Sequence, residues 1–351
     1  MGVVSRTTGA AVLVAMGCLI PVGAAQDSGA ARRAYLRAVV GFSSADIRHL
    51  EAGRPVASSL DGRDGLEVVT FGAVRLAADP AAVLDHISGL HTLRRSAGVL
   101  AVGTITAPPL PSDFQELALN PADLASLAKC RPGECGVQLP AWAIQRFRDG
   151  VAWRSPDARR TADQLARDMA HRIVSGYMTG GHRGIDPYHD RNPSPRPGDE
   201  YANLLAADQY LPAPFSALRG YLRGYPKAAL AGVDNQFFWA TVEAALKPTT
   251  HISHMVVARS GALGPSTLPI TGAIVTTQLF ATHYYSSTLE WHIVIDDPAR
   301  DEGAYLIYLS RSWVPGMTGI RGRLTRPIVR GRVRDAIERY LAYIKNVIEA
   351  D

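Results

Sequence analysis

The sequence predicts an α+β fold in which a curved antiparallel sheet grips a long C-terminal helix, with a large, mostly helical insertion in the middle of the chain. Three observations predict it. Four stretches rich in Val, Ile, Thr and Tyr follow residue 251, separated by short turns, which is typical of an antiparallel meander. Residues 329–349 repeat apolar side chains every three to four positions, as an amphipathic helix does. Residues 112–245 carry mainly helical patterns.

The first 25 residues have the pattern of an export signal. Arg6 is the only charged side chain among them, Ala10–Ile20 form an apolar run, and Pro21 ends that run before small residues. A run of this length suits a cleavable leader and is short for a membrane span. We therefore expect cleavage near Ala25 and a protein that works in the periplasm or outside the cell.

The next segment predicts a strand, a helix and a second strand. Residues 27–60 look helical and then irregular. Leu66–Leu76 has apolar residues at both alternating sets of strand positions, which indicates a strand buried on both faces. Asp79 and Pro80 are residue types favoured at the N-cap and the first position of a helix, so a helix is expected to begin there. Val99–Thr106 is the second strand.

The middle of the chain, residues 112–245, is expected to form a helical insertion. It has no clear linker on either side, so we expect it to wrap around the sheet within one α+β domain of residues 26–351. Residues 180–198 are rich in glycine and proline and predict a loop. The expected helices begin at Pro121 and Pro140, run over Asp157–Met178, and follow near 199–210 and 214–223.

Residues 251–349 are expected to form the meander and the closing helix. A long helix against a curved sheet leaves a cavity where side chains do not fill the space, and such cavities are the usual sites of small-molecule binding. The strand candidates are His251–Arg259, Ala273–Tyr285, Leu289–Ile295 and Ala304–Ser312.

Two cysteines remain after the leader, in the sequence Cys130-Arg-Pro-Gly-Glu-Cys135. The Pro-Gly pair favours a turn between them, and export to an oxidising compartment favours a disulfide. A metal site would need a second pair of ligands, which the sequence does not offer. We therefore predict a structural disulfide, no metal and no cofactor.

Candidate site residues lie on the strand that ends in His283-Tyr-Tyr285. By alternation along a strand, His283, Tyr285 and Ser287 share one face. If that face lines a cavity, His283 titrates near neutral pH and Tyr285 donates a hydrogen bond to a ligand, so both are candidates for binding or acid–base chemistry. The alternative is an ordinary sheet face whose polar groups are satisfied by neighbouring residues.

Arginine dominates the last part of the chain and contributes to a formal net charge of +5. Arg321, Arg323 and Arg326 precede the closing helix, where they would lie near the mouth of a cavity and favour an anionic head group. A solvated helix face with some ion pairs is the alternative. For an exported protein, an anionic membrane surface is a more fitting partner than nucleic acid, which we do not expect.

Two family resemblances carry expectations about the fold. The segment VVTFGAVRLAADPAAVLDHISGL resembles the opening of helix-grip proteins of the START and polyketide-cyclase-like superfamily, and YLIYLSRSWVPGMTGIRGRLTRPIVRGRVRDAIERYLAYIK is similar to their last strand, loop and long helix. The resemblance implies a cavity for a lipid or another apolar small molecule. The whole chain also resembles a family of uncharacterised exported bacterial proteins, through its Cys-x-Pro-Gly-x-Cys loop and through His283, Tyr284, Tyr285, Ser287 and Leu289.

The leading hypothesis is therefore an exported, lipid-binding type of protein that holds an apolar or amphiphilic small molecule and catalyses no reaction. An enzyme that uses His283 and Tyr285 in the same cavity is a second hypothesis. An envelope interaction protein with a basic surface and a packed core is a third. The sequence shows no Gly-x-Ser-x-Gly elbow and no His-Glu-x-x-His pair, and it indicates no oligomeric state.

Overall fold

The computed structural model describes the backbone of residues 22–62, 66–96, 98–206, 209–244, 247–300, 302–315 and 319–350. Side chains are described over the same ranges, except for residues 22–28, 61, 244 and 319–326. Most of the expected leader, residues 1–21, lies outside the described residues.

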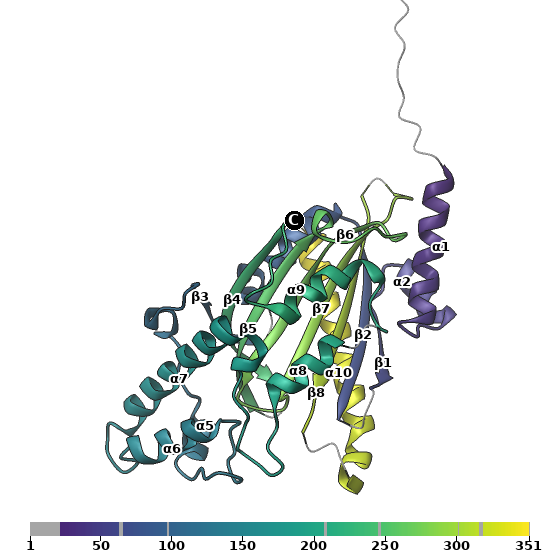
Figure 1. The fold of residues 1–351 in the computed structure, drawn as a ribbon. Coiled ribbons are helices and arrows are strands. Elements are labelled where there is room, and N and C mark those ends of the chain that lie inside the picture. The colour runs from purple at the N-terminus through teal and green to yellow at the C-terminus, as the bar shows by residue number, and fades with distance from the viewer. Residues whose placement is uncertain are drawn as a thin grey trace, which may run out of the picture.

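The described residues form one twisted antiparallel sheet of eight strands in the order β1-β2-β8-β7-β6-β5-β4-β3 (Figure 1). Every neighbouring pair is antiparallel, and the long pairings β4–β5, β2–β8 and β7–β8 run along nearly their whole length. The strands are β1 (Val56–Asp61), β2 (Glu67–Leu76), β3 (Val99–Ile105), β4 (Val233–Ala244), β5 (Lys247–Arg259), β6 (Ile270–Ala281), β7 (Ser287–Asp296) and β8 (Ala304–Trp313).

The expected antiparallel sheet and terminal helix are confirmed, but two strands were missed. Strand β1 has two serines in its six residues and reads as irregular. Strand β4 begins with the polar run Asp234-Asn-Gln236, which hides it from a search for apolar strands. Its position corrects the expected boundaries: the helical insertion does not extend to residue 245, and it lies between β3 and β4, which pair with each other.

Helices cover both faces of the sheet (Figure 1). Helices α8 and α9 lie over one face and α10 over the other, together with α3. The helices are α1 (Val22–Ala38), α2 (Ser44–Glu51), α3 (Pro80–Ser88), α4 (Leu90–Arg95), α5 (Pro121–Leu127), α6 (Ala141–Gly150), α7 (Ala158–Gly180), α8 (Pro197–Ala206), α9 (Ser216–Gly224) and α10 (Gly319–Ile348). The Asp79 carboxylate accepts a hydrogen bond from the Ala82 amide at 2.8 Å, so the predicted cap of α3 is confirmed.

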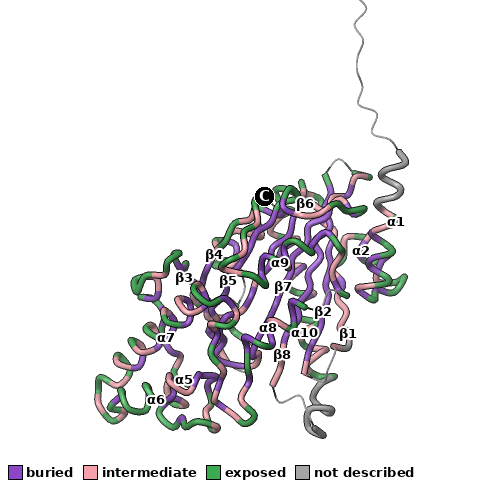
Figure 2. Tube along the Cα trace, viewed as in Figure 1, coloured by how far each residue is buried: buried purple, intermediate pink, exposed green. Residues whose placement is uncertain are grey.

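The insertion has two parts. Helices α5, α6 and α7 form a lobe with its own apolar core, which also includes Phe237, Trp239 and Phe280 from the sheet. Helices α8 and α9 lie across the sheet itself, where Leu204 and Phe215 pack against Trp291 and its neighbours. Figure 2 shows the buried strands between the helical layers and the exposed outer surface of the lobe.

Helix α10 runs alongside β2 in the same direction. Glu338 accepts a hydrogen bond from the Ala57 amide, and Lys345 donates one to the Arg75 carbonyl. Between these contacts the helix touches the sheet at Gly72, where a Cβ atom would lie 2.5 Å from Ile337 Cγ2 and 2.7 Å from Leu341 Cδ1. The missing side chain therefore sets how closely α10 approaches the sheet.

We expect Gly72→Ala to lower the free energy of unfolding by about 1–3 kcal/mol, because the added methyl overfills a packed contact. Urea unfolding measures this. Gly261→Ala is the matched control, since no atom lies within 4 Å of the added methyl there, and it should change stability little. Combining Gly72→Ala with Ile337→Ala should cost less than the sum of the two single changes. Strict additivity would contradict the proposed contact.

Candidate functional site

The sheet face that α10 covers is divided into an apolar half and a polar half. Strand pairing aligns Val74, Leu306 and Val294 in one row across β2, β8 and β7. Further along the same strands, the corresponding row consists of Thr70, Ser310 and Glu290. Apolar side chains of α3 and α10 pack on the first half, and the same apolar cluster continues across the sheet to Met255 and Phe238.

A cavity of about 430 Å³ lies over the polar half. Helix α4 and the end of α3 bound it with Ile87, Leu90 and Leu93, and α10 bounds it with Val333, Ile337 and Tyr340. Short serine and threonine side chains leave room that longer ones would fill. The sheet contributes Val68, Thr70, Phe238, Val242, Thr249, His251, Ser253, Met255, Thr276, Gln278, Thr288, Glu290, His292, Tyr308, Ser310 and Ser312.

Glu290 is the acidic side chain of this cavity. Tyr308 donates a hydrogen bond to Glu290 Oε1 at 2.6 Å. Burial raises the pKa of Glu290, and the hydrogen bond from Tyr308 opposes that shift. Among the described lining residues there is no lysine or arginine, so no protein cation faces this carboxyl group within the cavity.

Two histidines of the cavity are held neutral by burial. His292 Nε2 lies 3.0 Å from the Tyr340 hydroxyl, and His251 Nδ1 lies 3.1 Å from the Ser253 hydroxyl. Burial lowers the pKa of each to about 4. His292 Nδ1 and Thr70 Oγ1 are buried without a hydrogen-bond partner in the described part of the chain. Unpaired buried polar atoms beside a cavity mark positions where a ligand atom or water gains a hydrogen bond.

The structure separates the three strand residues that the sequence grouped together. Tyr285 lines the cavity. His283 Nε2 instead lies 2.7 Å from Asp123 Oδ1 of α5, and the Ser287 hydroxyl donates to Glu200 of α8. These residues do not share a face, because β6 ends at Ala281 and the chain turns before β7.

The turn between β6 and β7 explains this correction. Tyr284 has a φ of 66°, in the left-handed region that breaks the alternation of a strand. His283 and Ser287 consequently fasten helices of the insertion to the sheet, on the face away from the cavity. The expected convergence of His283 with Tyr285 on a ligand is not present.

The arginines in the last part of the chain lie in separate places in the fold. Arg311 is buried on the face opposite the cavity and forms an ion pair with Glu67, so it does not face a cavity ligand. The side chains of Arg321, Arg323 and Arg326 lie outside the described residues, although their backbone belongs to α10. Arg330 and Arg334 line a separate open hollow beside β1.

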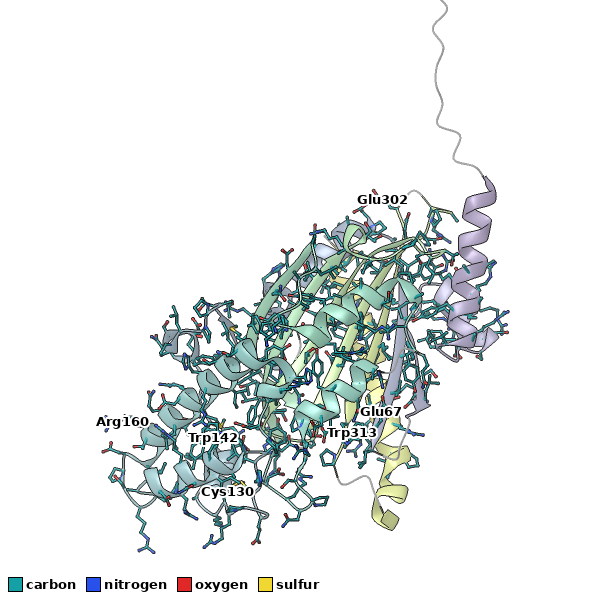
Figure 3. The ribbon with its side chains drawn as sticks, in the orientation of Figure 1. Glu67, Cys130, Trp142, Arg160, Glu302 and Trp313 are labelled. Atoms are coloured by element: carbon teal, nitrogen blue, oxygen red, sulfur yellow. A yellow bond between two sulfur atoms is a disulfide. The ribbon has the colours of Figure 1, made fainter. Side chains whose placement is uncertain are left out.

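Cys130 and Cys135 form a disulfide, as predicted. Figure 3 shows Cys130 and Trp142 in the lobe of α5–α7, away from Glu67 and Trp313 at the end of the β2–β8 pair. His189 and Asp190 accept hydrogen bonds through their carbonyls from Gly133 and Cys135, so the disulfide loop anchors the segment after α7. The disulfide contributes to the lobe and not to the cavity.

Sequence patterns alone did not single out Glu290, Tyr308 or Tyr340. A signal for Glu290 was present: it lies inside the strand Ser287–Asp296, whose other acid, Asp296, is the last residue of the strand. Tyr308 and Tyr340 have ordinary core patterns, and only the packing of α10 against the sheet brings them together at the cavity.

In comparisons with protein-family models, with curated proteins and with solved structures, nothing matches this chain. Within the described ranges, no three His, Cys, Asp or Glu residues are grouped so as to hold a metal ion. None of the described helices combines the length and apolar character that crossing a membrane requires.

The buried neutral histidines predict acid sensitivity. A histidine whose pKa falls from about 6.5 unfolded to about 4 folded stabilises the protein above pH 6.5, and this contribution is lost as the pH falls toward 4. The free energy of unfolding of the parent protein should fall between pH 7 and pH 4.5. We expect this fall to be about 2 kcal/mol smaller in His292→Gln. Urea titrations of both proteins at the two pH values measure it. An unchanged difference would show that His292 is protonated in the folded protein.

Proposed function

We propose that this protein is an exported binding protein that holds a single amphiphilic small molecule between the sheet and α10. The observation that carries the proposal is the cavity of about 430 Å³, which lies within the usual size range of ligand pockets. Its walls differ in polarity: hydroxyl, carboxyl and imidazole groups line β7 and β8, and Leu90, Leu93 and Val242 form an apolar wall at the other side. A ligand with a polar head and an apolar body complements both.

A binding function explains the residues that line the cavity better than a catalytic function does. The Glu290–Tyr308 pair on β7 and β8 is separated by β6 from the His251–Ser253 pair on β5. His292 lies beside the first pair, but its Nε2 is engaged with the Tyr340 hydroxyl, and burial lowers its pKa to about 4. Acid–base catalysis requires its groups within hydrogen-bond reach of one reacting atom. His283, the base of the enzymatic hypothesis, is engaged with Asp123 on the other side of the sheet. The alternative of a packed-core envelope protein does not account for the cavity.

The proposal also includes export of the protein and its relationship to helix-grip proteins. The pattern of residues 1–25 supports export to the periplasm or beyond. The order β2–α3–β3 at the start and β8–α10 at the end supports kinship with helix-grip proteins. The chain would then be a variant in which the β3–β4 connection carries an added lobe and a second helical layer.

A cavity-filling substitution tests the proposal. Thr276 points from the central strand β6 into the cavity. We expect the phenyl ring of Thr276→Phe to occupy space that the ligand needs. Binding of a polarity-sensitive fluorescent amphiphile should weaken at least about 10-fold, which corresponds to a loss of ~1.4 kcal/mol of binding free energy. Thr276→Val is the matched control, since it keeps the side-chain volume and should retain binding.

The two variants also need a check on folding. Circular dichroism and the melting temperature should remain near those of the parent protein, because the phenyl ring enters existing space. Ser310→Phe fills the cavity from β8 and provides a second filling variant. Equal probe binding by the parent and by both folded Phe variants would contradict the cavity as the binding site.

A further inference from the structure

The polar wall of the cavity is built around one carboxyl group and several tyrosines. Glu290 lies on β7, with Tyr308 on β8, Tyr340 on α10 and Tyr285 in the β6–β7 turn. Burial and the nearby Glu290 raise the pKa of Tyr285, Tyr308 and Tyr340, so all three phenols keep their protons. The rings of Tyr308 and Tyr340 lie 5.8 Å apart at their centroids, beside the ring of His292.

The described residues of this wall include one acidic side chain, Glu290, and no lysine or arginine. Its two histidines, His251 and His292, are neutral at pH 7 because burial lowers the pKa of each to about 4. The described helical lining adds apolar and hydroxyl side chains, such as Leu90 and Thr92 of α4 and Ser96 after it. A buried carboxylate without a cation costs free energy, whereas a partner of opposite charge offsets that cost. Tyrosine rings add attraction for a cation through their π faces.

We propose that the ligand of this cavity carries a cationic head group, an amine or a quaternary ammonium, which pairs with Glu290 among the tyrosine rings. The proposal rests on the small-molecule site proposed above and specifies its ligand class. An anionic head group would meet the Glu290 carboxyl and the oxygen atoms of neighbouring hydroxyls without a compensating charge. A neutral head group would use the hydrogen bonds but would leave Glu290 without a counter-ion.

The position of the apolar wall indicates where the rest of the ligand lies. Strand β4, which carries Phe238 and Val242, is three strand positions away from β7. At ~4.8 Å for each step, this separation is roughly 14 Å. A medium-length alkyl chain extends from Glu290 to that wall, so a single-chain amine fits the arrangement.

A charge series of ligands with one chain length tests the proposal. Decylamine, decanol and decanoate are titrated into the full folded protein at pH 7 by isothermal calorimetry, below the concentration at which they form micelles. We expect decylamine to bind at least ~10-fold more tightly than decanol, because a hydrogen bond to a charged group contributes at least that ratio of affinities. Decanoate should bind most weakly.

The variant Glu290→Gln keeps the shape of the side chain and removes its charge. It should bind decylamine no more tightly than decanol, while its affinity for decanol stays within a few-fold of the parent. Glu243→Gln is the matched control: Glu243 is exposed on β4 and does not line the cavity, so the same change of net charge there should leave the preference intact.

The outcomes distinguish whether the cavity binds a small molecule from whether that molecule has a cationic head group. Equal binding of the three ligands, or preference for decanoate, overturns the cationic head group and leaves the cavity as a binding site. A preference for decylamine that survives in Glu290→Gln also overturns the role of Glu290. If none of the three binds, the small-molecule site itself is overturned, and the cationic head group with it. The parent protein alone decides the charge preference if Glu290→Gln does not fold.

Discussion

Helix α10 contacts the sheet at positions that carry an apolar side chain or, at Gly72, no side chain. At Gly72 the helix approaches closely enough for Ile337 and Leu341 to occupy the place of a side chain, and beyond it Val74, Leu306 and Val294 continue an apolar surface. In the other direction the same strands present Thr70, Ser310 and Glu290. These side chains are short or polar, and the cavity lies over them, bounded on the helix side by Val333, Ile337, Tyr340 and Ile344. The cavity follows from this division of a single sheet face.

The opposite face has a different role. There the polar residues are paired with one another and hold the helices in place: His283 with Asp123, Ser287 with Glu200, and Arg311 with Glu67. Pairing of buried charges and hydroxyls in this way makes the attachment of α5 and α8 specific. Conversely, His292 Nδ1 and Thr70 Oγ1 on the cavity face have no partner among the described residues.

Much of the fold could be predicted because its signals are local. The Asp79-Pro80 start of α3, the apolar run of β2 and the period of α10 each lie within one segment of sequence. The site could not be predicted in the same way. Alternation placed His283, Tyr285 and Ser287 together, but the left-handed backbone of Tyr284 breaks the strand at that point. Glu290 and Tyr340 are 50 residues apart in sequence, and their proximity depends on the packing of α10, which no local pattern encodes.

The central claim is that the space between α10 and the polar half of the sheet holds a ligand. A crystal structure of the protein purified from its own export route, without detergent, tests this claim most directly. The account predicts continuous non-protein density in the cavity, with one end against Glu290 and Tyr308 and the other toward Val242. A cavity closed by Tyr285 or Tyr340 side chains, with no space left between α10 and β7, would contradict it.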